Sequence, residues 1–156
     1  MRFQMVDRIL EVEPGKRIRL VKNLTLAEEY LADHFPSFPV MPGVLMLQTL
    51  VEAGAWLLRI SDDFRHSVIV LREARNVKYG NFMQPGKSLV VTVDLAEAND
   101  HEVVFKGKGE SDGASTVSAK ITVGRYNLGD RDPALKAMDE KIVSHLRGVY
   151  ATIRPN

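Results

Sequence analysis

Apolar residues are concentrated most strongly at positions 44–58, where they occupy nearly every face of the helix that this segment would form. The run continues without a helix breaker until Gly54, and the polar residues at 61–63 end it. A surface helix shows one apolar stripe, whereas a helix that is apolar on every face is buried. The pattern therefore predicts one long central helix that is buried on all sides.

The chain before this helix has the pattern of a β-hairpin. Residues 3–12 are rich in β-prone side chains and end at a Glu-Pro-Gly-Lys sequence, which is a turn signal. Basic and apolar side chains alternate at 17–24, which indicates a half-exposed second strand. Residues 25–31 then predict a short helix, with Thr25 as its N-cap and Glu28 three residues later as in a capping box.

The chain after the central helix predicts a further set of strands. They are expected at residues 67–79, 88–96, 102–109 and 116–123. Asn99-Asp100 and Asp112-Gly113 separate the last three, and Asp-Gly is a strong signal for a two-residue hairpin. An antiparallel sheet that meets a single apolar helix is expected to curl around it, so the chain predicts an α+β fold.

The pattern changes again beyond residue 123. Asp132 can cap a helix that has Pro133 at its first position. Apolar residues then recur every three to four positions, which indicates an amphipathic helix: Leu135, Met138, Ile142, Leu146 and Val149. We expect this helix to pack on the sheet or on a neighbouring subunit. Residues 1–125 would thus form the main domain, and residues 126–156 a helical extension of the same domain.

Composition and charge narrow the class of protein. A chain of 156 residues, 45% hydrophobic and 26% charged, is typical of one soluble globular domain. The net charge of +1 gives no indication of nucleic acid or of a membrane surface as a partner. The absence of cysteine excludes disulfides and thiolate ligands and fits a reducing compartment. Residues 1–12 carry charges and no apolar core, so we predict no secretory leader and a cytoplasmic location.

The apolar run at 40–58 is the segment that could be mistaken for a membrane span. A spanning helix needs about 20 predominantly apolar residues. This run contains Pro42, Gly43, Gln48 and Glu52, so we interpret it as a buried core helix.

Candidate chemistry lies in the loop that leads into this helix. Three prolines follow His34 before Gly43, and proline restricts both its own φ and the residue before it. A stiff loop therefore carries one ionisable side chain to the start of a buried helix. Free backbone N–H groups at that helix start could polarise a carbonyl group or hold an anion.

The residues of this loop carry a family resemblance. The sequence His-Phe-Pro-Ser-Phe-Pro-Val-Met-Pro-Gly-Val-Leu at 34–45 resembles the signature of the β-hydroxyacyl-(acyl-carrier-protein) dehydratases of fatty-acid synthesis, a hotdog-fold family. Residues 1–9 are similar to the opening strand of that family, and residues 81–89 to its mid-chain Pro-Gly turn. The resemblance covers roughly residues 1–125 and implies a hotdog fold, in which the sheet wraps around the central helix.

The resemblance implies a role for His34 as the catalytic base. Dehydration of a 3-hydroxyacyl thioester requires removal of a proton next to the carbonyl, and the ordinary histidine pKa of about 6.5 suits that task. A loop histidine that only bonds its neighbours is the alternative, which we rank lower. Gly43 would hold the thioester carbonyl through its N–H, or would simply let the loop enter the helix. The other histidines stand alone without metal-ligand spacing, and we expect no metal and no cofactor.

Gln48 departs from the family pattern. The family has Glu or Asp fourteen residues after the histidine, and an amide cannot donate the proton that the departing hydroxyl needs. Loss of a general acid typically costs about 10²- to 10⁴-fold in rate. Glu52 lies one turn later, where the family commonly has Gln. In one interpretation Glu52 replaces the missing acid and reaches the substrate through another rotamer or a water. In the other, Glu52 is a structural residue whose carboxylate is held in hydrogen bonds. Both interpretations stay open.

By the same resemblance the site would be shared in a homodimer or a higher oligomer. His34 of one chain would face Gln48 and Glu52 of the other, with the acyl tunnel near Phe35, Val44, Leu45 and Leu47. The substrate would be a thioester of acyl carrier protein or coenzyme A. One alternative is a thioester-binding or structural subunit, which could form a heterodimer with a partner that supplies the acid. The other alternative is a hotdog thioesterase that uses Glu52.

A basic bias in the second half allows a further interpretation. Arg72, Arg75, Lys78 and Lys87 could steer an acidic carrier protein. A solvated strand face explains them more simply, and we rank that explanation higher.

Overall fold

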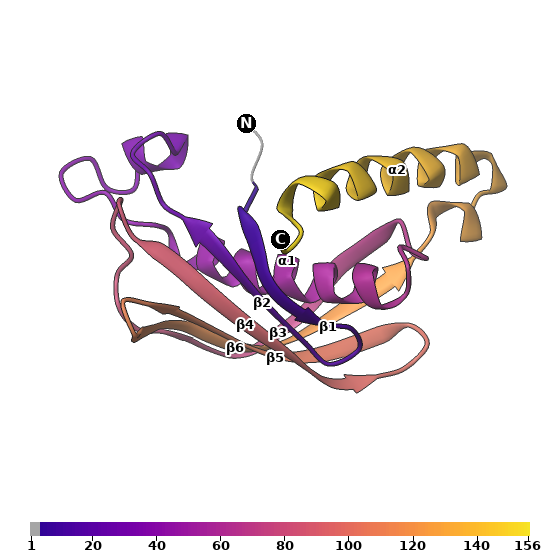
Figure 1. The fold of residues 1–156 in the computed structure, drawn as a ribbon, viewed down its shortest axis with the longest axis horizontal. Coiled ribbons are helices and arrows are strands. Elements are labelled where there is room, and N and C mark those ends of the chain that lie inside the picture. Colours follow the sequence, from indigo (N-terminus) through magenta and orange to yellow (C-terminus); the bar gives the residue numbers. More distant parts are fainter. Residues whose placement is uncertain (1–3) are drawn as a thin grey trace.

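The structure is a computed structural model that describes residues 4–156. Six antiparallel strands form one sheet in the order β1-β2-β4-β5-β6-β3. Their bounds are Arg8–Glu13 for β1, Arg17–Asn23 for β2, Val68–Tyr79 for β3, Ser88–Ala98 for β4, Glu102–Ser111 for β5 and Ala114–Tyr126 for β6. The long helix α1, Gly43–Ser61, lies in the curve of the sheet, as Figure 1 shows. This is the predicted α+β arrangement, with the sheet curled around one central helix.

The core lies between α1 and the concave face of the sheet. Strand residues that point toward the helix are fully buried, including Leu20, Val91, Phe105 and Ile121. They alternate along each strand with residues that face the other way, as the period of two requires. Leu50 of α1 is likewise fully buried against them. Burial of one face of the sheet and most of one helix therefore fixes the two layers.

The predicted hairpins are confirmed. β1 pairs with β2 across a turn in which Lys16 N–H donates to Glu13 O, and Gly15 has a φ of 74°. β5 pairs with β6 across Asp112 and Gly113, which have φ values of 52° and 75°. Positive φ at both central residues is what a two-residue hairpin turn of this type requires, so the Asp-Gly signal located the turn correctly.

The first strand was predicted too early. β1 begins at Arg8, whereas the sequence pattern placed its start at residue 3, which lies outside the described residues. Met5 and Val6 are buried, and the N–H of Met5 donates to the Glu52 carboxylate. This segment therefore packs against α1, and apolar side chains alone did not distinguish that packing from a strand.

The short helix at 25–31 was predicted with the wrong cap. The structure has a 3₁₀ helix, η1, at Glu29–Ala32, and its N-cap residue Glu28 makes no side-chain cap hydrogen bond. The Thr25 hydroxyl accepts instead from Ala27 N–H. The Glu28 carboxylate lies 2.7 Å from Lys22 Nζ, so the ion pair takes the oxygen that a capping box would have used.

The helix α1 has the predicted bounds, but its burial was overestimated. Its middle and C-terminal part are buried in the chain, whereas Val44 is 67% exposed and Leu45 and Leu47 are half-buried. α1 is long and apolar enough to cross a membrane by length and composition alone. Because 56% of its most apolar window is buried within the chain, it has the character of a core helix.

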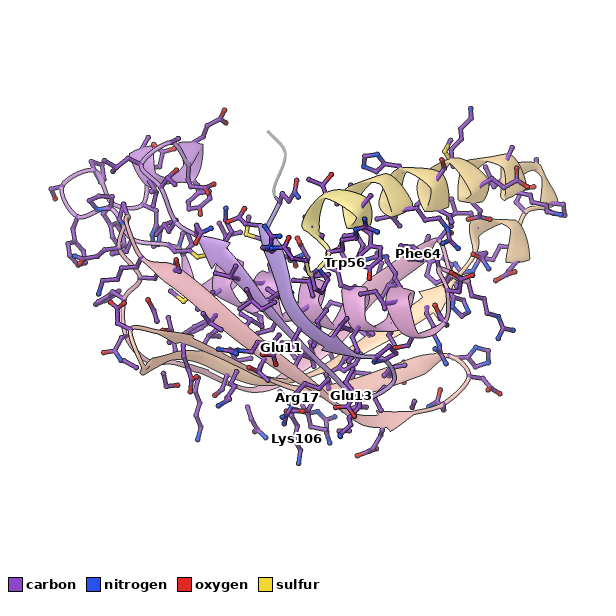
Figure 2. All side chains as sticks on the ribbon, in the orientation of Figure 1. Glu11, Glu13, Arg17, Trp56, Phe64 and Lys106 are labelled. Atoms are coloured by element: carbon purple, nitrogen blue, oxygen red, sulfur yellow. The ribbon has the colours of Figure 1, made fainter. Side chains whose placement is uncertain are left out.

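The C-terminal segment forms two 3₁₀ turns and a helix. These are η2 at Leu128–Asp130, η3 at Pro133–Leu135 and α2 at Lys136–Ile153. Asp132 is a cap as predicted, because its Oδ1 accepts from Ala134 N–H at 3.0 Å and Pro133 follows it, but it caps η3. The amphipathic helix α2 begins later than predicted, and its own N-cap residue Leu135 makes no side-chain cap hydrogen bond. The helix packs over α1, where the Tyr150 ring lies 6.3 Å from that of Trp56 and 5.8 Å from that of Phe64, and it also contacts the edge strand β1 of the sheet. Figure 2 shows both rings on the side of α1 that faces α2.

The predicted apolar stripe of α2 is partly wrong. Leu135 and Met138 are 38% and 48% exposed, whereas Leu146 and Val149 pack against the core as predicted. The other residues that turn inward are Asp139, Val143, Tyr150 and Ile153. Periodicity could not predict a buried acid at this place. Asp139 accepts hydrogen bonds from the Ser67 hydroxyl, from Leu128 N–H at 2.9 Å and from Gly129 N–H at 2.8 Å. These bonds anchor the start of α2 to the start of β3.

Candidate active site

His34 begins a loop that is closed by its own backbone hydrogen bonds. Val40 N–H donates to His34 O at 3.0 Å, and Phe35 and Phe38 exchange N–H···O bonds of 3.3 and 3.0 Å. The His34–Phe35 peptide bond is cis. The loop is thus held by its backbone as well as by its prolines, and it presents one half-buried imidazole.

The hydrogen bond of the imidazole selects its tautomer. His34 Nδ1 lies 3.0 Å from the carbonyl oxygen of Val40, and a carbonyl oxygen can only accept. Nδ1 therefore carries the hydrogen, and in the neutral ring the lone pair is on Nε2. The ring also stacks on Phe35 with centroids 4.3 Å apart. An oriented imidazole with a basic Nε2 is suited to accept a proton from a bound molecule.

The loop ends at the first turn of α1. Met41 N–H donates to Met83 O at 2.9 Å, which ties the loop to the turn before β4. Leu45 and Met46 both donate their N–H groups to Pro42 O. Within residues 4–156, neither Gly43 N–H nor Val44 N–H has a hydrogen-bond acceptor, as expected at a helix start. These two donors, together with the positive end of the helix dipole, can stabilise a carbonyl oxygen that gains negative charge.

Tyr79 lies against this helix start, and the sequence pattern did not identify it. A Cβ atom at Gly43 would lie 3.0 to 3.2 Å from three carbons of the Tyr79 ring. The ring is 50% exposed at the end of β3. Gly43 is therefore needed for the close approach of this ring as well as for the loop. The only sequence signal was an aromatic residue before Gly-Asn at the end of a predicted strand.

Apolar side chains surround the helix start and are open to solvent in the single chain. Phe38 and Phe82 meet edge to face with centroids 5.7 Å apart. The Phe35 side chain is 50% exposed, and those of Phe82 and Val44 are each 67% exposed. Of the residues predicted to line an acyl tunnel, Phe35 and Val44 are thus exposed, and Leu45 and Leu47 are half-buried.

Gln48 and Glu52 lie together on one face of α1. Gln48 Nε2 donates to Glu52 Oε1 at 3.4 Å, and Met5 N–H donates to Glu52 Oε2 at 3.2 Å. Burial raises the pKa of Glu52 above its ordinary value, against the opposing effects of these hydrogen bonds and of the Arg59 and Lys22 charges. With its Nε2 directed at Glu52, the amide of Gln48 has its oxygen left to accept a hydrogen bond.

Lys22 is a further charged residue beside this region that the sequence did not single out. Its side chain is 7% exposed and lies between Glu28, at 2.7 Å, and Asp7, at 3.4 Å. Asp7 also accepts from Asn23 N–H at 2.6 Å. A buried ammonium group on β2 thus joins Asp7, the residue before β1, to the segment that precedes the His34 loop.

Within the described chain, no hydrogen bond or ion pair joins His34 to Gln48 or Glu52. The chain brings the histidine to the start of α1 and places the amide and the acid further along the helix. Among residues 4–156, no group of three or more histidine or acidic side chains could hold a metal ion.

Comparison with known proteins identifies the family. The FabA-like domain matches residues 1–120, which is most of the chain. The chain belongs to the FabA-like family. The 3-hydroxyacyl-[acyl-carrier-protein] dehydratase FabZ of Geobacillus thermodenitrificans is 36% identical over 132 residues, which cover 83% of this FabA-like chain and 87% of the relative. The FabZ of Bacillus subtilis is 35% identical over 130 residues, with 82% and 89% covered. The predicted resemblance to the hydroxyacyl dehydratases is confirmed.

Solved structures give the same fold at low sequence identity. The dehydratase heterocomplex ApeI:P from Xenorhabdus doucetiae matches with a TM-score of 0.68 at 13% identity, and covers 85% of this chain and 90% of that one. The protein smu.793 from Streptococcus mutans bound to acetyl CoA matches with a TM-score of 0.61 at 13% identity over 80% and 92%. A hypothetical thioesterase with coenzyme A from Streptococcus pneumoniae matches with a TM-score of 0.56 at 13% identity. The match covers 76% of this chain and 84% of that one. These similarities confirm the hotdog fold.

Proposed function

We propose that this FabA-like protein is a hydro-lyase that dehydrates 3-hydroxyacyl thioesters of acyl carrier protein or coenzyme A. The observation that carries the proposal is the hydrogen bond between His34 Nδ1 and Val40 O, because it leaves Nε2 basic. Family membership and the FabZ relatives support the reaction type. We place the reaction in fatty-acid or related lipid biosynthesis in the cytoplasm, and assign residues 126–156 as an extension of the same domain.

In the proposed reaction His34 Nε2 removes a proton from C2 of the acyl group. Negative charge then develops on the thioester oxygen, where the N–H groups of Gly43 and Val44 stabilise it. The C3–O bond breaks, and the hydroxyl leaves as water after it receives a proton. The product is a 2-enoyl thioester, and no redox change or cofactor is required.

The departing hydroxyl needs a proton, and Gln48 stands where the family has the acid that would donate it. The Gln48 amide can hold the substrate hydroxyl by accepting its hydrogen, but it has no acidic proton to give. Glu52 is the carboxylic acid in hydrogen-bond contact with Gln48, at 3.4 Å. Its raised pKa keeps more of it protonated near neutral pH, which suits a proton donor. We therefore assign Glu52 as the acid, acting through a water or after a rotamer change.

We propose that two chains complete the site. His34 has no contact with Gln48 or Glu52 in its own chain, so a second copy would have to bring them opposite each other. Exposed Phe35, Val44 and Phe82, and the free edge of β3, provide the surface for such a dimer. Light scattering at micromolar protein should give at least a dimer; a monomer would contradict the shared site.

Hydration of crotonyl-CoA, the reverse reaction, tests the proposal with the purified chain alone. We expect slow formation of 3-hydroxybutyryl-CoA, because a weakened acid costs about 10²- to 10⁴-fold. Glu52→Gln should abolish this activity if Glu52 is the acid. Absence of turnover would refute the proposed function, and thioester binding without turnover would favour a binding subunit instead.

A second candidate function is a thioester-binding subunit without activity of its own. It is favoured by the hydrogen bonds that both Glu52 oxygens already make, to Gln48 and to Met5 N–H. In that case crotonyl-CoA binds to the chain but is not hydrated, and a hotdog partner that carries the acid restores turnover. A thioesterase that uses Glu52 to activate water would instead release free coenzyme A, which the same assay detects.

A further inference from the structure

A groove of about 370 Å³ lies at the end of the sheet opposite to Tyr79. Val68 pairs with Tyr126 at this end of β3 and β6, whereas Tyr79 pairs with Val117 at the other. The residues that line the groove are Arg72, His101, Glu102, Arg125, Tyr126 and Arg131. Three guanidinium groups thus share one groove with a single carboxylate.

Arg72 is directed into this groove by an irregularity of β3. The ladder with β6 shifts register between Leu71 and Glu73, so Arg72 is the extra residue of a β-bulge. Bulges of this kind change the direction of a side chain, and they are frequent beside binding sites. The side chain of Arg72 crosses β6 at Gly124, where a Cβ atom would lie 2.5 Å from its Nε. The glycine is required for this path of the arginine across the strand.

Arg125 is the best-fixed of the three arginines. Its Nη2 donates to Asn99 O at 3.0 Å, and its Nη1 lies 3.7 Å from the Asp62 carboxylate. Its Nε is buried and has no hydrogen-bond partner within residues 4–156. Within residues 4–156, Oδ1 of Asp62 is likewise buried without a hydrogen-bond partner, so the two side chains satisfy each other only in part, and Arg125 mainly fixes this side of the groove.

Arg131 comes from η2–η3, beyond the part of the chain that matches the FabA-like domain. Its guanidinium lies over the ring of Tyr126, 5.2 Å from the centroid, which holds it beside the groove. Neither Arg131 nor Arg72 forms an ion pair with any carboxylate of residues 4–156. Two guanidinium charges in the groove are therefore not neutralised by the chain.

We propose that this groove binds a phosphate group. A guanidinium presents several N–H donors in a planar arrangement that matches phosphate oxygens, and arginine is the usual residue for such recognition. A phosphate would neutralise Arg72 and Arg131, the two guanidinium groups of the groove that form no ion pair with a carboxylate of residues 4–156. The ligand is either free phosphate or a phosphate monoester on a larger molecule. The Arg72 side chain runs over β6, away from the free edge of β3 that the proposed dimer would cover. The phosphate site lies at the other end of the sheet from the proposed catalytic groups and does not depend on the reaction assigned to them.

Calorimetric titration of the full chain with inorganic phosphate, against chloride at equal ionic strength, tests this site. We expect saturable binding with a Kd of about 1 mM or tighter. Arg72→Gln and Arg131→Gln should each weaken it about tenfold, since each removes a charged donor of an exposed side chain. Glu102→Gln, which removes the carboxylate from the groove, should tighten binding. Arg75→Gln is the matched control, because Arg75 lies on the same strand and is already paired with Glu73 at 2.9 Å.

A second titration separates the two sources of phosphate. If coenzyme A binds about tenfold more tightly than 3′-dephospho-coenzyme A, and Arg131→Gln removes the difference, the ligand is a monoester. If only inorganic phosphate binds, with no difference between the two coenzymes, the ligand is free phosphate. Either result supports the site. Absence of saturable binding in the unmodified chain, or equal weakening by Arg75→Gln and Arg72→Gln, would overturn the proposal.

Discussion

The ring of Tyr79 lies against Gly43, so that a Cβ atom at position 43 would lie 3.0 Å from ring carbon Cε1. This contact joins the end of β3 to the first residue of α1, on the side where Val44 is exposed. Real Cβ atoms rarely approach a neighbour so closely, so the glycine and the ring are adapted to each other. Any larger residue at 43 would displace the ring from the helix start.

Gly43→Ala should therefore destabilise the chain and disturb the site. The added methyl group must displace the Tyr79 ring by a few tenths of an ångström, and because that ring is 50% exposed we expect a cost of about 1 kcal/mol, at the low end of the range for overpacking. Tyr79→Ala in the same chain should recover most of that loss, because it removes the ring that the methyl group meets. Urea unfolding of the two single variants and the double variant measures the coupling.

Gly148→Ala is the matched control for this measurement. Gly148 lies in α2, and nothing lies within 4 Å of a Cβ atom there. Alanine in that helix should be stabilising by roughly 0.5 to 1 kcal/mol. Additive effects of Gly43→Ala and Tyr79→Ala, within about 0.5 kcal/mol, would show that the ring and the glycine do not interact.

His34→Ala should remove the proposed base without unfolding the chain. We expect the rate of crotonyl-CoA hydration to fall at least 10²-fold, the usual size of a lost acid–base group, with an unchanged urea midpoint. His145→Gln, on the exposed side of α2, is the control and should keep the rate. An active chain that keeps its rate in His34→Ala would reduce the histidine to a structural loop residue.

Asp139 should make the stability of the chain depend on pH. Burial would raise its pKa, but the hydrogen bonds from Ser67, Gly129 and Leu128 outweigh burial and lower the pKa below its ordinary value. A carboxylate with a lowered pKa stabilises the folded state above its unfolded pKa, near 3.9, and this stabilisation is lost as the pH falls through the folded value.

Unfolding of the unmodified chain and Asp139→Asn at several pH values measures this effect. We expect the variant to melt at a lower temperature at pH 7 and to approach the unmodified chain as the pH falls toward 3. Asp100→Asn, in the exposed loop between β4 and β5, is the control. Parallel stability curves for the two chains over the whole pH range would mean that Asp139 does not anchor α2 through its charge.

Most of the fold could be predicted from the sequence because its signals are local. The period of two in the strands, the Asp112-Gly113 turn and the apolar run of α1 each depend on residues close in the chain. The loop motif also located the loop that runs from His34 to Gly43 at the helix start. The family itself followed from the same motif.

The remaining features depend on contacts between distant residues. The position of Met5 off the sheet depends on Glu52, 47 residues away, and the start of α2 depends on the bond between Ser67 and Asp139, 72 residues apart. Tyr79 could not be assigned to the site for the same reason, since no local pattern relates it to Gly43. The exposed first turn of α1 differs from the predicted burial because a composition pattern does not show which face has a partner within the chain.

Gln48→Glu tests whether the site lacks only a proton donor at position 48. Glutamate is nearly the same size as glutamine, so packing on α1 should change little. The new carboxyl group would lie one turn from Glu52, in place of the amide that now donates to Glu52 Oε1 at 3.4 Å. Two carboxyl groups so close cannot both ionise easily, and partial burial acts in the same direction. Both effects raise the pKa of the pair, so that one proton is retained near neutral pH.

That retained proton is what the departing hydroxyl needs. We therefore expect Gln48→Glu to dehydrate 3-hydroxybutyryl-CoA faster than the unmodified chain, by up to about 10²-fold, with a rate that declines as rising pH removes the shared proton. The double variant Gln48→Glu, Glu52→Gln exchanges acid and amide and should retain the gain. Stopped assays across pH 5 to 9 with all four chains distinguish the roles. An unmodified chain that is fast, insensitive to Glu52→Gln and slowed by Gln48→Glu would show that the amide itself takes part in the reaction.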